Sequence, residues 1–282
     1  MRWKGREQST NVEDRRGMSS GKKVAGGTIG TLVIVLIVWL LGGNPSAVIN
    51  QLQTETTTEA APANYSAEEE ELVAFVSVVL KDTEDIWKKL FAQSNERYRE
   101  PKLVLFSSAV ESACGYNSAA TGPFYCPADE KVYIDLNFLI QLQERLGATG
   151  DFAMAYIIAH EVGHHVQKLL GIMDEFHRNN ANVSKETYNS NMVRLELQAD
   201  FLAGIWAHHA QRTKNILEPG DVDEAVNAAA MVGDDRLQMK SQGYVVPDAF
   251  THGTSEQRSR WFLRGFQTGD LGQGDTFSAR VL

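Results

Sequence analysis

The sequence predicts an α+β protein that is mostly helical, with a small sheet and one transmembrane helix ahead of the folded domain. Apolar residues recur at helical spacing in several segments between residues 66 and 282. Two short apolar runs typical of strands, 102–106 and 131–135, lie among these segments. Residues 24–43 contain no charged residue, and about 20 such residues are enough to cross a bilayer as a helix.

Charge is distributed unevenly along the chain. The formal net charge is −9, yet residues 1–23 contain seven Lys/Arg and only three acidic residues. The rest of the chain therefore carries a net charge of −13. An acidic protein without a basic patch argues against nucleic acid as a partner.

The first 65 residues divide into three segments. Residues 1–23 are polar and charged, which predicts a disordered, basic cytoplasmic tip. Residues 24–43 are predicted to be an uncleaved membrane anchor, and the basic residues before them place the N-terminus in the cytoplasm. Residues 44–65, which are rich in Thr and Gln, predict a flexible linker. A cleaved signal peptide, which would release a soluble secreted protein, is the alternative.

Residues 66–282 form the predicted folded domain. Helices are expected, in chain order, at 66–91, 137–146, 151–170, 185–214, 221–243 and 254–266. Capping boxes are expected at three helix starts, formed by Ser66 with Glu69, Asp221 with Glu224, and Thr254 with Gln257. Asp151 is the expected N-cap of the third helix, and Gly171 its C-terminal stop. The stretches 114–126, 171–184 and 244–253 are expected to be loops.

The chain has two cysteines, Cys114 and Cys126. If the domain faces an oxidising compartment, as the expected orientation of the anchor implies, a Cys114–Cys126 disulfide is predicted. Reversed topology would instead predict two free buried thiols.

The sequence His-Glu-Val-Gly-His at residues 160–164 lies within an apolar run. His160 and His164 are four residues apart, so on a helix their imidazoles lie on one face, one turn apart. Two imidazoles at this spacing can bind one Zn²⁺. Glu161 then lies beside the metal, where a carboxylate can accept a proton from water. An ordinary helix with two core histidines is the less specific interpretation.

A hydrolytic zinc site needs a third protein ligand, and Glu196 is the best candidate. Leu195 and Leu197 flank it, which is unusual for a merely solvated carboxylate. Asp200 lies one turn further on the same side of the predicted helix. Zinc-bound imidazoles generally donate their other N–H to a carboxylate, so Asp200 fits that role. An ordinary i,i+4 acidic pair is the alternative.

The H-E-x-x-H motif and the downstream E-x-x-A-D resemble those of gluzincin metallopeptidases of the thermolysin type. The resemblance is closer to the bacterial family of putative neutral zinc metallopeptidases, which are single-span membrane proteins. It covers nearly the whole chain, through 1–3, 11–16, 122–126, 160–165, 196–200 and 250–258. It implies a zincin-like fold for residues 66–282 and a zinc peptidase that acts on peptides or proteins. It also implies Glu196 as third ligand, Asp200 as support for a histidine ligand, and a bacterial inner membrane protein with its domain periplasmic or extracellular.

Other histidines are weaker ligand candidates, namely His165, His177, His208, His209 and His252. His165 points about 100° round the helix from His164, so the two cannot easily share a metal. His252 lies in a predicted loop, and it or Tyr244 could stabilise the oxyanion of a tetrahedral intermediate. Local packing of His252 is the equally weighted alternative.

The mechanism predicted from these residues is metal-assisted peptide hydrolysis with Glu161 as general base. The strand at Lys131–Asp135 could hold an extended substrate by pairing at a sheet edge. A non-catalytic membrane scaffold stabilised by zinc is the alternative function.

Overall fold

A computed structural model describes residues 1–17, 65–118, 122–140 and 150–282. Two compact units result, Met1–Arg15 with Ser66–Leu282, and Arg16–Tyr65. The predicted anchor (24–43), the predicted linker (44–65) apart from Tyr65, and residues 141–146 of the predicted helix 137–146 lie outside the described residues. Among the residues that are described, no helix is both long enough and apolar enough to cross a membrane. All that follows concerns the first unit.

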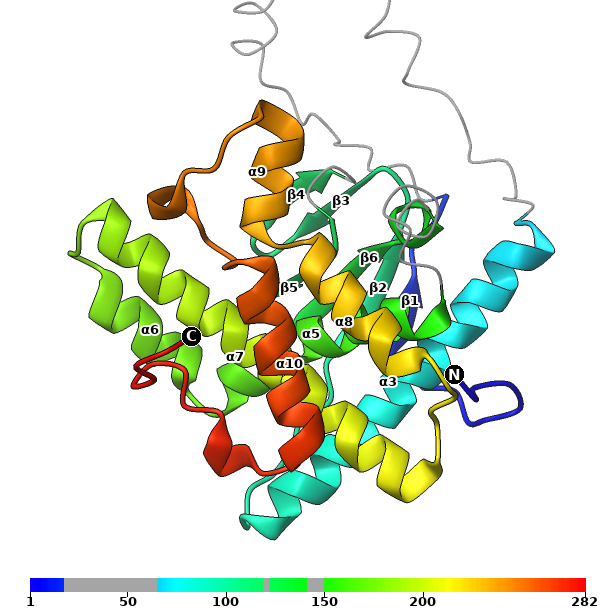
Figure 1. Ribbon diagram of the computed structural model, residues 1–282. Coiled ribbons are helices and arrows are strands. Elements are labelled where there is room, and N and C mark those ends of the chain that lie inside the picture. Colours follow the sequence, from blue (N-terminus) through cyan, green and yellow to red (C-terminus); the bar gives the residue numbers. More distant parts are fainter. Residues whose placement is uncertain (18–64, 119–121, 141–149) are drawn as a thin grey trace, which may run out of the picture. The chain divides into compact units, whose positions relative to one another are not determined.

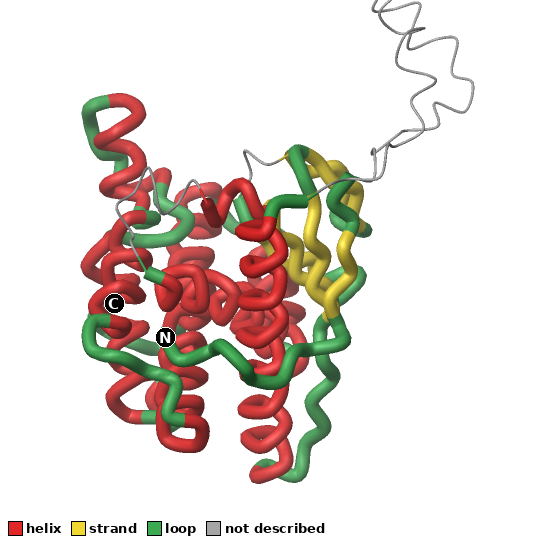
Figure 2. Tube along the Cα trace, turned by 90° about the vertical axis from the view of Figure 1, so that its right-hand side faces the viewer, coloured by secondary structure: helices red, strands yellow, loops and turns green. Residues whose placement is uncertain are grey.

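This unit is mostly helical, as predicted, with its strands gathered on one side (Figures 1 and 2). Its helices are α3 (Ala67–Gln93), α5 (Asp151–Leu169), α6 (Ile172–Asn180), α7 (Lys185–Lys214), α8 (Asp221–Met231), α9 (Asp234–Gln242) and α10 (Ser255–Thr268). Helix α5 is the central element, because sixteen of its nineteen residues are buried. It packs against α3, α7 and α8.

The main sheet has the strand order β1-β2-β6-β5. Strands β1 (Val12–Asp14), β2 (Lys102–Phe106) and β6 (Lys131–Asp135) are parallel, and β5 (Phe124–Cys126) is antiparallel to β6. The prediction that Lys131–Asp135 offers a free sheet edge is wrong, because β6 lies between β2 and β5. An apolar run buried on both faces is typical of such an internal strand.

The region 114–126 is not a plain loop. A hairpin of β3 (Ala109–Ser112) and β4 (Gly115–Ser118) precedes β5. The predicted Cys114–Cys126 disulfide is confirmed, with an S–S distance of 2.06 Å. It joins the turn of this hairpin to the end of β5.

Residues 1–15 belong to the folded unit, so the prediction of a disordered tip is wrong for them. Strand β1 pairs in parallel with β2. Glu84 on α3, which is 3% exposed, accepts hydrogen bonds from Ser9 Oγ at 2.6 Å and Asn11 Nδ2 at 2.8 Å. Arg6 pairs with the buried Asp82 at 2.6 Å. The polar composition of this segment therefore satisfies buried carboxylates instead of indicating disorder.

Two helix predictions also need correction. Residues 171–184 contain α6, whose Met173 and Phe176 are buried against the core. Residues 221–243 form two helices instead of one, with a break at Val232-Gly233. A side chain at Gly233 would lie 2.4 Å from the backbone nitrogen of Ser255, so α10 begins directly against this break.

Two predicted caps are replaced by contacts between distant elements. Gly220, not Asp221, is the N-cap of α8. Glu224 accepts a hydrogen bond from the backbone N–H of Phe152 at 3.1 Å, so it caps α5 instead of its own helix. Gly150 stands at the N-cap of α5, and Asp151 is its first residue. The boxes at Ser66 and Thr254 are confirmed, as is the left-handed Gly171 after α5.

Candidate metal centre

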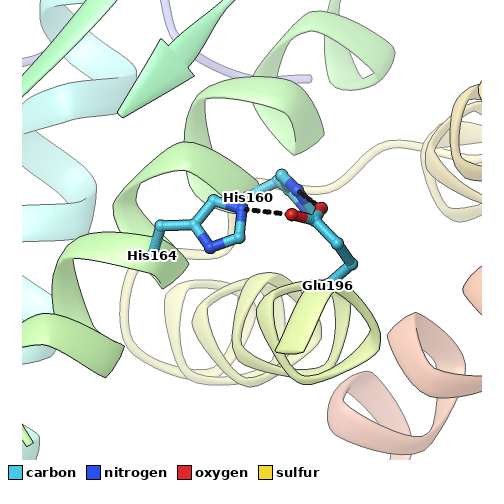
Figure 3. Close-up of side chains that lie close together, drawn as sticks. All are labelled: His160, His164 and Glu196. Atoms are coloured by element: carbon cyan, nitrogen blue, oxygen red, sulfur yellow. Dashed lines mark hydrogen bonds and ion pairs between the residues drawn. The ribbon is translucent and has the colours of Figure 1, made fainter. Parts of the chain in front are cut away.

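Three side chains from two helices converge at the middle of the unit. His160 and His164 come from α5, and Glu196 comes from the facing turn of α7 (Figure 3). Glu196 Oε2 lies 3.2 Å from His160 Nε2, and Glu196 Oε1 lies 3.4 Å from His164 Nε2. One ligand atom from each residue lies within 4.8 Å of the others. The two histidines are 7% and 8% exposed, so the site opens to solvent only narrowly.

A glycine allows the two helices to approach this closely. A Cβ at Gly163 would lie 2.9 Å from the carbonyl oxygen of Ala199 on α7. Gly163 directly precedes His164, and Ala199 directly precedes Asp200. The glycine inside the H-E-x-x-H motif therefore sets the distance across which the ligands meet.

The outer contacts of His160 fix its tautomer. Its Nδ1 lies 2.8 Å from Asp200 Oδ1, a carboxylate oxygen that can only accept, so Nδ1 carries the hydrogen. The lone pair of Nε2 is then directed toward Glu196. This is the arrangement that a metal-binding imidazole needs.

The tautomer of His164 is fixed by amides. Its Nδ1 lies 2.9 Å from Gln167 Oε1. The Gln167 amide nitrogen donates to the carbonyl of Leu195 at 2.7 Å and to Gln198 Oε1 at 3.0 Å, which assigns Oε1 as the acceptor for His164. His164 therefore also directs the lone pair of Nε2 toward Glu196.

These donors fit a divalent cation. Two nitrogen lone pairs and a carboxylate facing one another in a buried site are unfavourable unless a proton or a metal ion lies between them. Burial opposes the charged imidazolium, but Asp200 and Glu196 outweigh it and raise the pKa of His160 to about 10. Burial likewise opposes ionisation of Glu196, but the neighbouring imidazoles hold its pKa well below the usual value. Two histidines and one glutamate match the ligand set of hydrolytic zinc sites.

Asp200 is fully buried and has a partner that the sequence did not indicate. Arg258 on α10 donates to it from Nε and Nη2 at 2.8 and 2.9 Å. Burial opposes ionisation of Asp200, but Arg258 and His160 outweigh it and lower its pKa to about 2. Arg258 stood within the segment 250–258 that carried the family resemblance, but no local pattern connected it with Asp200.

Glu161 follows His160 on α5 and is 8% exposed. Among the described residues, its carboxylate has no hydrogen bond and no ion pair. Within the described part of the chain it is thus a carboxylate next to the two candidate ligand histidines that no neighbour engages.

His252 lies near the candidate metal site, held by a residue that sequence reasoning missed. Oδ2 of Asp234, the first residue of α9, accepts the backbone N–H groups of Thr251, His252 and Gly253 at 2.6–3.0 Å. Its Oδ1 lies 3.4 Å from His252 Nδ1. This hydrogen bond raises the pKa of His252, although partial burial of the ring opposes the increase. The negative charge of Glu196 raises this pKa further. The only signal in the sequence was an acidic pair after Gly233.

The loop that contains His252 also packs against α7, the helix that carries Glu196. Gly253 has a φ of +92°, and a Cβ there would lie 3.1 Å from Val193 Cγ1 and 3.4 Å from Leu197 Cδ2. These two residues flank Glu196 along α7. The side chain of His252 is 48% exposed, so it borders the site on the solvent side.

The remaining candidates lie apart from this centre. Tyr244 is 60% exposed, and within the described residues its hydroxyl has no hydrogen bond to the ligands or to His252. His165 is fully buried and bonds to Tyr125 and the Arg99 carbonyl. His208 and His209 bond to backbone carbonyls of α10 and its C-cap, and His177 is exposed on α6.

A second acidic group, Asp151, Asp221 and Glu224, lies at the N-terminal ends of α5 and α8. The ammonium group of Met1 contacts Asp151 and lies 3.4 Å from Asp221 Oδ2. Asp151 and Asp221 are therefore paired with an ammonium group of the chain, and Glu224 accepts a hydrogen bond from the backbone N–H of Phe152.

The chain is similar over most of its length to known proteins. A family model described as "Putative neutral zinc metallopeptidase" matches residues 1–277. The chain is 47% identical to "Uncharacterized protein YpfJ" of Escherichia coli (strain K12) over 290 residues, which covers 100% of both chains. It is 38% identical to "Uncharacterized protein Rv2575" of Mycobacterium tuberculosis over 260 residues, which covers 86% of each. No solved structure matches.

Proposed function

The chain belongs to the family of putative neutral zinc metallopeptidases, and we propose that it is a zinc-dependent peptidase. His160, His164 and Glu196 would hold the metal. The observation that carries this proposal is the convergence of two Nε2 lone pairs on one carboxylate, with both tautomers fixed by outer contacts. Three protein ligands leave coordination positions for substrate and water, as in hydrolytic sites.

Bound zinc would act as a Lewis acid that polarises a peptide carbonyl and lowers the pKa of water. Glu161 accepts the proton of the attacking water and later transfers it to the leaving amine. Its position directly after His160 and its lack of other partners within the described chain support this role.

His252 is the proposed donor to the oxyanion that forms at the attacked carbonyl. Asp234 orients the loop through three backbone N–H groups, and its charge favours the protonated imidazole that can donate. Tyr244 is a weaker candidate for this role because of its exposure.

Peptides and proteins are the proposed substrates, bound at β5 instead of β6. Strand β5 is the last strand of the sheet and contacts α5. Its outer edge could add an extended peptide by backbone pairing. The OH group of Tyr125 on β5 is 3.0 Å from His165 Nδ1, which fixes the strand to the helix that carries the histidine ligands.

For localisation, we propose that residues 1–15 and 66–282 share one compartment outside the cytoplasm. Strand β1 is part of the same sheet as β2 and β6, and a membrane cannot separate neighbouring strands. The disulfide supports an oxidising compartment. This proposal replaces the expectation of a cytoplasmic N-terminus. A single crossing of the membrane by residues 24–43 would put these two parts on opposite sides, so the single-span anchor expected from the sequence is not part of this proposal.

Metal analysis combined with cleavage of a random peptide library tests the function. Wild-type protein should contain one zinc per chain and cleave peptides. Glu161→Gln should retain zinc and lose cleavage by several orders of magnitude, whereas His160→Ala should lose both. Unchanged cleavage in Glu161→Gln would refute the mechanism, and zinc without cleavage in the wild type would support the scaffold alternative.

A further inference from the structure

The carboxylate of Asp200 is held from three sides. Its Oδ1 accepts from His160 Nδ1 at 2.8 Å, Tyr156 OH at 2.5 Å and Arg258 Nη2 at 2.9 Å, and its Oδ2 accepts from Arg258 Nε at 2.8 Å. Asp200 is 0% exposed, Tyr156 1% and Arg258 3%. Because these side chains are buried from solvent, the position of the carboxylate depends on the protein groups that contact it.

The guanidinium of Arg258 is suited to this contact by its shape. Two of its nitrogens bind the two oxygens of Asp200 side by side. The nitrogen Nη2 also donates to Tyr156 OH at 3.2 Å, and Nη1 reaches the carbonyl of Val232 at 3.4 Å. A lysine ammonium carries the same charge but cannot form this planar, two-point contact.

The fold determines the register between Arg258 and Asp200. Helices α7 and α10 cross in close contact at two glycines, Gly204 on α7 and Gly265 on α10. A Cβ at Gly204 would lie 2.1 Å from the carbonyl oxygen of Phe262, and a Cβ at Gly265 would lie 2.1 Å from the carbonyl oxygen of Phe201. Asp200 lies one turn from this crossing point on α7, and Arg258 lies two turns from it on α10. The glycine contact therefore holds the two helices close together on this side of the crossing point, where the long side chain of Arg258 reaches Asp200.

The two metal-binding histidines have outer partners of different kinds. A neutral amide, Gln167, is sufficient to fix the tautomer of His164. The carboxylate behind His160 does more, because it increases the basicity of the imidazole toward a metal. A buried carboxylate is stable only when a cation is paired with it, and Arg258 is that cation.

We propose that Arg258 and Tyr156 are positioning residues that hold Asp200 against His160 and so set the affinity and geometry of the metal site. This proposal rests on the proposed zinc-binding function. Neither residue touches the metal or the substrate. Arg258 Nη2 also lies 3.4 Å from His160 Nδ1, so these residues would act on the metal site through Asp200 and His160.

Zinc affinity, measured by competition with a chromophoric chelator, tests the proposal. Arg258→Lys should weaken zinc binding about 10- to 100-fold, as loss of an outer partner generally does. Tyr156→Phe should cause a smaller loss. Arg260→Lys is the matched control, because Arg260 lies on the same helix but, among the described residues, bonds to Glu256 and the Leu282 carbonyl and not to Asp200. The zinc affinity of this variant should equal that of wild type.

The visible spectrum of the cobalt-substituted protein provides a second measurement. It should change in Arg258→Lys and not in Arg260→Lys, which a general loss of stability would not produce. Wild-type affinity and spectrum in Arg258→Lys, or an equal loss in Arg260→Lys, would overturn the proposal. If Arg258→Lys does not fold, Tyr156→Phe decides, and an unchanged affinity there overturns it. Absence of stoichiometric zinc in the wild type would instead refute the proposed function.

Discussion

Gly163→Ala should weaken zinc binding although it changes no ligand. The new Cβ would lie 2.9 Å from the Ala199 carbonyl, whereas ordinary contact begins near 3.4 Å. Helices α5 and α7 must therefore separate by about 0.5 Å, which exceeds the tolerance of about 0.2 Å in metal–ligand distances. Inserting a methyl group into a packed contact costs about 1–3 kcal/mol. If the metal must restore the original spacing, this cost corresponds to about 5- to 150-fold in zinc Kd.

Competition with a chromophoric chelator measures this change directly. Gly272→Ala provides the matched control, because Gly272 is exposed and the three atoms nearest to its added methyl group all belong to the flexible side chain of Asp270. Its zinc affinity should equal that of wild type. A Kd for Gly163→Ala within about twofold of wild type would show that the spacing of α5 and α7 does not control the site.

Four further outcomes are expected. His252→Ala should lower kcat about 10²- to 10³-fold, as loss of an oxyanion donor does. Asp234 raises the pKa of His252, so activity that needs protonated His252 persists below that raised pKa and falls as the pH rises through it. Asp234→Asn should therefore move the alkaline limb of the kcat/KM profile to lower pH. An alkaline limb that does not move would exclude His252 as the donor. Replacing Cys114 and Cys126 by serine should lower the free energy of unfolding by about 3 kcal/mol, measured by denaturant titration, and equal stability would contradict this. Single cysteines replacing the exposed Glu7 and Asp223 should react alike with a membrane-impermeant maleimide on intact cells; labelling at Asp223→Cys alone would contradict the shared compartment.

The residues of the metal centre that could be predicted are those linked by helical spacing. His160 and His164 lie four residues apart on one helix, and so do Glu196 and Asp200. Each pair therefore occupies one face whatever the rest of the fold does. The predicted bounds of α7 and β2 match the structure for the same reason, since local patterns determine them.

Local patterns failed where a distant partner competed for the same group. Asp221 and Glu224 have capping-box spacing, but Glu224 caps α5 across the α5–α8 contact. Residues 1–15 have the composition of a disordered tip, but the buried Glu84 and Asp82 bind their side chains. Composition reports how polar a segment is, not whether buried groups elsewhere require that polarity.

The segment from His252 to Arg258 shows what such distant contacts add to the site. The backbone N–H of His252 donates to Asp234, which lies 18 residues earlier in the chain. Arg258 donates to Asp200, which lies 58 residues earlier and on another helix. Neither distance has a sequence period, so no pattern could predict these pairs. Yet the seven residues from His252 to Arg258 include the proposed oxyanion donor and the cation that pairs with Asp200 behind His160, a proposed metal ligand. Because the Thr254 capping box joins loop and helix into one rigid piece, a shift of α10 would move both groups together.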